Sequence, residues 1–91
     1  SKKMNQIIKQ IEQIKKTIED SLPIIDNHIN TIIQTQSQDI KTIEQTLDTL
    51  LDYIPLGLAQ DQFTKLNNYY HTFNEHNSNI YNSYLLEALE D

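Results

Sequence analysis

The sequence predicts an all-α fold: an up-down-up three-helix bundle built on a long antiparallel helical hairpin with coiled-coil-like packing. Apolar residues recur at alternating spacings of three and four, which is the period of a helix seam. The chain has only one Gly and two Pro in 91 residues, so long elements with few turns are expected. The apolar positions also mirror each other about residues 55–58. A length of 91 residues suits one helical domain over residues 1–91.

The mirrored positions define the hairpin. The descending stripe contains Ile25, Ile29, Ile33, Gln36, Ile40, Ile43, Leu47, Leu50 and Ile54, and the returning stripe contains Ala59, Phe63, Leu66, Tyr70, Phe73, Asn77, Ile80, Tyr84 and Ala88. Each residue of the first stripe lies as far before the turn as its partner lies after it. Two helices of residues 23–54 and 58–90 are therefore expected to pack antiparallel.

A first helix is predicted over residues 2–20, where Met4, Ile7, Ile11, Ile14 and Ile18 follow heptad spacing. Residues 21–23 then interrupt it, with Ser21 as a plausible N-cap and Pro23 suited to the first turn of a new helix. We expect the chain to reverse here, because the hairpin has a wide apolar face at its open end that a folded-back helix would cover. The alternative is a kinked helix that continues through Pro23.

The second and third helices meet at the Ile-Pro-Leu-Gly step. Pro55 cannot continue the helical hydrogen-bond ladder, and Gly57 permits a positive φ. The third helix is expected to continue to about residue 90, although residues 76–79 have poor helix propensity. The helical pattern is still running at both ends of the sequence, as expected for a piece of a longer chain.

The two polar positions of the mirrored stripes, Gln36 and Asn77, fall opposite each other. One interpretation is a buried amide pair that fixes the register of the hairpin, because a slipped register would leave an amide against an apolar side chain. The other is a solvated edge at which any polar residue fits.

The tip of the hairpin is predicted to be an interface. A first helix of about 20 residues covers only the open end, which leaves apolar side chains near the turn without cover, and exposed patches of this kind mark interaction sites. The residues expected to carry the interface are Leu50, Leu51, Ile54, Phe63, Leu66 and Tyr70. The expected function is a non-enzymatic protein-protein interaction or assembly module that binds a second copy or a partner helix.

Charge limits the partners. The net charge is −6, with five Lys and three acids in residues 1–22 but two Lys and ten acids in residues 23–91. An acidic body without Arg disfavours nucleic acid, and no apolar run is long enough for membrane insertion. There is no Cys, and His71 and Glu75 supply two metal ligands where three or four are needed. We therefore expect no cofactor, metal or catalytic residue, and a soluble domain without a recognisable targeting segment.

Three alternatives remain at this stage. The chain could be a small acidic inhibitor or immunity-type protein that acts as a monomer and presents Asp39, Glu44, Asp48 and Asp52 to a basic target. Residues 2–54 could instead form one kinked rod that dimerises. A sensor domain cut from a longer receptor is the third possibility.

Overall fold

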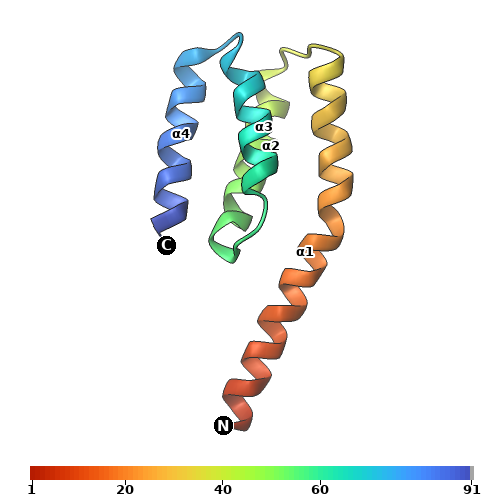
Figure 1. Cartoon of the computed structure of the whole chain (residues 1–91), viewed down its shortest axis with the longest axis vertical. Coiled ribbons are helices and arrows are strands. Elements are labelled where there is room, and N and C mark those ends of the chain that lie inside the picture. Colours follow the sequence, from red (N-terminus) through yellow and green to blue (C-terminus); the bar gives the residue numbers. More distant parts are fainter. Residues whose placement is uncertain (91) are drawn as a thin grey trace.

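The computed structural model describes residues 1–90, and within them the chain forms helices joined by short turns, with no β-strand. The elements are α1 (Lys2–Gln34), α2 (Ile40–Tyr53), the short 3-10 helix η1 (Ile54–Leu56), α3 (Gln60–His71) and α4 (Glu75–Glu90). Figure 1 shows consecutive α-helices running in alternating directions along the long axis of a molecule that measures 51 × 26 × 18 Å. The all-α prediction is confirmed for these residues, but four α-helices replace the expected three.

The predicted reversal at residues 21–23 is wrong, because α1 runs through Pro23 without a break. Proline removes one backbone hydrogen bond and crowds the carbonyl four residues earlier, which bends a helix without necessarily ending it. The Ser21 hydroxyl donates to the Ile18 carbonyl oxygen at 2.6 Å, a contact that accompanies helix bends. Figure 1 shows the resulting bend in α1. The helix bounds 2–20 and 23–54 are corrected accordingly.

The first reversal lies instead at residues 35–39, inside the predicted second helix. Gln36 adopts a left-handed φ of 52°, which ends the helical path. Asp39 then caps α2, since its carboxylate accepts from the Thr42 backbone N–H at 3.2 Å and from the Thr42 hydroxyl at 2.8 Å. These hydrogen bonds lower the pKa of the Asp39 carboxyl. Capping by the Asp39 side chain starts a new helix where the apolar periodicity alone predicted continuity.

A second break, at residues 72–74, divides the predicted helix 58–90 into α3 and α4. The Asn74 side-chain oxygen accepts from the Asn77 backbone N–H at 3.2 Å, which is the geometry of an N-cap. The break returns α4 alongside α2 and α3, toward the η1 turn. The last part of the chain therefore covers the tip of the hairpin rather than extending its far end.

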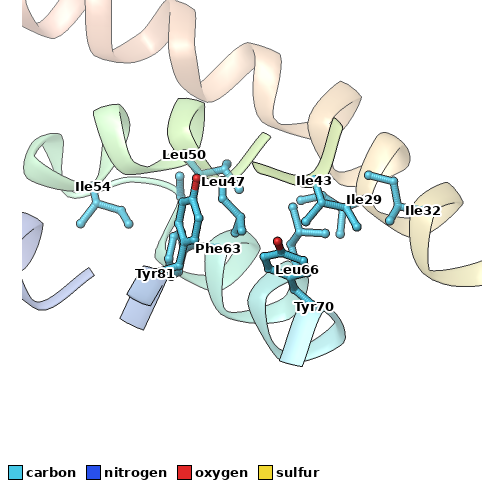
Figure 2. Close-up of a cluster of buried hydrophobic side chains, with 11 residues drawn as sticks. Ile29, Ile32, Ile43, Leu47, Leu50, Ile54, Phe63, Leu66, Tyr70 and Tyr81 are labelled. Atoms are coloured by element: carbon cyan, nitrogen blue, oxygen red, sulfur yellow. The ribbon is translucent and has the colours of Figure 1, made fainter. Parts of the chain in front are cut away.

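The core lies between α2 and α3 and extends onto α1 and α4 (Figure 2). Its buried apolar residues are Ile29, Ile32, Ile43, Leu47, Leu50, Ile54, Ala59, Phe63, Leu66, Tyr70 and Tyr81. The mirrored pairs nearest the predicted turn, from Ile43 with Tyr70 to Ile54 with Ala59, all belong to this cluster. The turn itself uses positive φ at Gly57 (79°) and Ala59 (71°).

Candidate protein interface

The structure places the six predicted interface residues in or beside the core. Leu50, Phe63, Leu66 and Tyr70 are fully buried and Ile54 is 4% exposed, while Leu51 is half-buried. The expectation that they form an exposed patch at the tip is therefore wrong. The reason is the break at residues 72–74, which lets α4 pack against η1 and brings Leu85 and Ala88 onto this cluster.

The predicted Gln36–Asn77 register pair does not form. Gln36 is exposed in the turn between α1 and α2, whereas Asn77 lies in the first turns of α4. The Asn77 amide donates to Glu44 Oε2 at 3.1 Å and to the Tyr70 hydroxyl oxygen at 3.2 Å. The mirrored pairing fails here because Gln36 lies before the start of α2 and Asn77 lies beyond the end of α3.

Polar contacts instead join α2 to α3 and to α4. The Tyr70 hydroxyl donates to Glu44 Oε2 at 2.6 Å, and the Tyr81 hydroxyl donates to Asp48 Oδ1 at 2.8 Å. Burial first, and then the hydrogen bond to Glu44, raises the pKa of Tyr70 to about 12. Burial likewise raises the pKa of Tyr81. Both phenols therefore keep their protons at neutral pH and act as donors.

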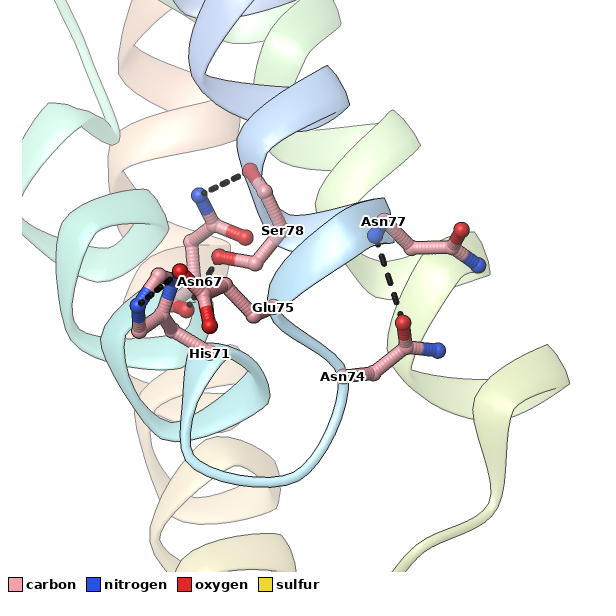
Figure 3. Close-up of polar contacts among 6 residues, drawn as sticks. All are labelled: Asn67, His71, Asn74, Glu75, Asn77 and Ser78. Carbon is pink, nitrogen blue, oxygen red and sulfur yellow. Dashed lines mark hydrogen bonds and ion pairs between the residues drawn. The ribbon is translucent and has the colours of Figure 1, made fainter.

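Asn67 ties α3 to α4. Its side-chain amide donates to the Ser78 carbonyl oxygen at 3.1 Å, and the Ser78 hydroxyl donates back to the Asn67 carbonyl oxygen at 3.0 Å (Figure 3). The same amide also donates to Asn82 Oδ1 at 2.9 Å. Asn67 Oδ1 is buried without a hydrogen-bond partner among the described residues. These reciprocal bonds hold α4 along α3, whereas the Gln36–Asn77 pair was expected, on one of two interpretations, to fix the register of the hairpin.

The part of the chain that the structure describes contains neither a cluster of metal ligands nor a membrane-spanning helix. His71 Nε2 and Glu75 Oε1 lie 3.9 Å apart on the surface, and within residues 1–90 no three potential ligands gather. No helix over these residues is both long and apolar enough to cross a bilayer. A cavity of about 180 Å³ is lined by Glu44, Asn77, Ile80, Tyr81 and Tyr84. The hydrogen bonds described above engage Glu44 Oε2, the Asn77 side-chain nitrogen and the Tyr81 hydroxyl.

Most of the large exposed apolar side chains among the described residues lie on α1, and a second group, Ile80, Tyr84, Leu86 and Leu89, lies on α4. Figure 1 shows the N-terminal part of this helix projecting past the turn that joins α2 to α3. We call residues 2–14 the arm, because all of them are exposed. The arm stripe consists of Met4, Ile7, Ile8, Ile11 and Ile14, whose side chains are 45–58% exposed. A single helix that displays five large apolar residues on one face is typical of a coiled-coil strand without its partner.

The arm stripe continues the face that α1 turns toward the bundle. Further along the same face, Ile18, Leu22 and Ile25 are half-buried and Ile29 is fully buried. Near the boundary, Lys15 extends toward the turn, and its Nζ lies 3.8 Å from the position that a Cβ would take at Gly57. The same side of one helix therefore serves the core at one end and stays open at the other.

The arm is basic and the bundle is acidic. The arm carries Lys2, Lys3 and Lys9 against Glu12, while residues 23–91 carry two Lys and ten acids. The heptad spacing of the arm stripe is visible in the sequence. The predicted reversal at Pro23 would have buried this stripe against the hairpin. The alternative of a helix that continues through Pro23 would have identified the exposed stripe.

Comparison of the chain with known protein families, with curated protein sequences and with solved structures gives no significant match. Its function is therefore inferred from the geometry of the surface itself.

Proposed function

We propose that this chain is a non-enzymatic helical assembly module that binds another helix along the arm stripe, with coiled-coil-like packing. The observation that carries the proposal is the exposure of Met4, Ile7, Ile8, Ile11 and Ile14 on a helix that leaves its own bundle. The proposed interface lies on the arm and not at the hairpin tip that the sequence predicted, because α4 buries the tip residues.

The free energy available to such an interface is substantial. Burying the exposed half of an Ile or Met side chain contributes about 1 kcal/mol, so the stripe offers about 5 kcal/mol from one side. Association costs about 4–15 kcal/mol in lost translational and rotational freedom. A partner must therefore present an apolar stripe of similar size, which a second amphipathic helix does.

Helix stability supports the same function. The arm is continuous with the 33-residue α1, but all of its residues are exposed, so packing against the bundle stabilises it little. The Ser1 hydroxyl caps its start by accepting from the Met4 backbone N–H at 3.2 Å. A docked helix would stabilise the arm in the conformation that it already adopts.

The acidic-inhibitor alternative receives less support from the geometry. Of its four proposed carboxylates, Asp39 caps α2, Glu44 accepts from Tyr70 and Asn77, and Asp48 accepts from Tyr81. These groups hold the fold together, so they are poorly placed to bind a basic target as a set.

Site-specific photo-crosslinking in the cells that produce the protein tests the proposal. A photoreactive residue at Ile11, in the arm stripe, should give adducts with a second polypeptide. The same residue at Gln13, which is exposed on the arm outside the stripe, should give few. Adding Ile7→Asp should remove the Ile11 adducts. Equal adducts from positions 11 and 13, or none from either, would overturn the assignment of the arm stripe as the binding surface.

A further inference from the structure

We propose that the helix bound by the arm stripe is the arm of a second copy of this chain, lying antiparallel to the first. The inference rests on the proposed function and names the partner of the same surface. Its basis is that the stripe is complementary to itself in one register.

The register follows from the heptad positions. Met4 and Ile11 occupy position a, and Ile7 and Ile14 occupy position d. In an antiparallel pair each a residue lies beside a d residue of the other helix. Placing Ile7 beside Ile11 of the second copy also places Met4 beside its Ile14. All four layers are then apolar, and the two-fold axis passes level with Lys9.

Ile8 supports this register independently. It lies at position e, where a coiled coil normally has a polar residue, and it is 45% exposed. On the proposed axis each Ile8 faces Ile8 of the other copy, so the extra apolar side chain is covered. Gln10, at position g, similarly faces Gln10 of the other copy. The interface is isologous and closed, as expected for a two-fold dimer.

The register uses only the segment that the bundle leaves free. Residues 4–14 are all exposed, and packing against the bundle begins with the half-buried Lys15 and Ile18. An antiparallel pair shifted by one heptad toward the bundle would need Ile18, which is half-buried against it, and a pair shifted the other way would keep only the layers of Met4 with Ile7. The exposure pattern therefore selects the register centred on Lys9.

Charge favours antiparallel over parallel arms. A parallel pair would hold two acidic bundles side by side, each with two Lys against ten acids in residues 23–91. An antiparallel pair places the bundles at opposite ends. It also brings the basic start of each arm, with Lys2 and Lys3, toward the other copy's hairpin turn, which Asp52 and Asp61 flank.

Cysteine cross-linking tests both the partner and its direction, and the natural chain has no cysteine that would interfere. Gln10→Cys places one thiol on each side of the proposed axis, so mild oxidation should give a disulfide-linked dimer. The matched control Gln13→Cys, also exposed on the arm, should cross-link about tenfold more slowly because its thiols face away from the other copy. Sedimentation should show a dimer whose dissociation constant rises about 100-fold with Ile11→Lys and changes little with Gln13→Lys.

The outcomes separate this inference from the proposed function. A dimer in which Ile11→Cys cross-links to itself and Gln10→Cys does not would be parallel, which overturns the antiparallel arrangement. A monomer in solution whose Ile11 photo-adducts contain a different protein overturns the second copy as partner and leaves the proposed function standing. A monomer without stripe-specific adducts overturns both.

Discussion

Replacing Gln36 by Gly should change the stability of the protein in opposite directions in two cases. It should stabilise the observed turn, and it would destabilise an uninterrupted helix over residues 23–54. Gln36 has a φ of 52°, a left-handed conformation that costs a residue with a Cβ about 1–2 kcal/mol and costs Gly almost nothing. Gly loses about 0.4–1 kcal/mol through the greater entropy of the unfolded chain. Gln36→Gly should therefore stabilise the protein by about 0.5–1 kcal/mol.

The expected change is measurable by urea or thermal unfolding. For a domain of this size, 1 kcal/mol corresponds to about 4–8 °C in Tm. The matched control is Gln34→Gly at the last residue of α1, which has helical geometry and should be neutral or destabilising. If Gln36→Gly lowered the free energy of unfolding by about 1 kcal/mol, as Gly does in a helix interior, the turn would be refuted and a continuous helix supported.

Two further predictions concern the core and its polar contacts. Leu47→Ala removes a fully buried side chain and should lower the free energy of unfolding by about 2–5 kcal/mol, whereas Leu86→Ala, at a 64% exposed position, should change it by less than about 0.5 kcal/mol. Similar losses in denaturant unfolding would contradict the packing described for α2. The pKa of Tyr70 is raised from 10.0 to about 12, so the folded state holds the phenol proton more tightly than the unfolded state. This contribution is fully present below pH 10 and is lost as the pH rises through 12. The stability difference between the natural protein and Tyr70→Phe should therefore shrink over this range, and a constant difference would show that the Tyr70 proton is not held by the fold.

Sequence periodicity predicted the helical class and the position of the turn near Gly57, because both depend on local chemistry. Pro55 lacks a backbone N–H and Gly57 takes a positive φ of 79°, so together they end the helical path here. Ile43, Leu47, Phe63 and Leu66 fall on one face at helical spacing. All four are buried. The pattern correctly placed them on the seam of the hairpin, but Phe63 and Leu66 were expected to stay uncovered at its tip.

The same periodicity overlooked two breaks, since a heptad pattern can continue in phase across a turn. Asp39 and Asn74 start new helices by accepting backbone hydrogen bonds. A short polar residue directly before an apolar position was the available signal at Asp39, whereas five polar residues follow Asn74. At Pro23 the error was the reverse: a break was predicted, but the helix continues through this residue with a bend.

The sequence by itself determined which side chains are apolar and how they recur along a helix. Only the tertiary structure decided which of them meet, because burial depends on where the chain turns back. The break at residues 72–74 places α4 over the hairpin tip and buries Phe63 and Tyr70, while the unbroken α1 carries Ile7 and Ile11 away from the bundle. Two stripes with similar spacing thus become a buried core and an exposed apolar stripe.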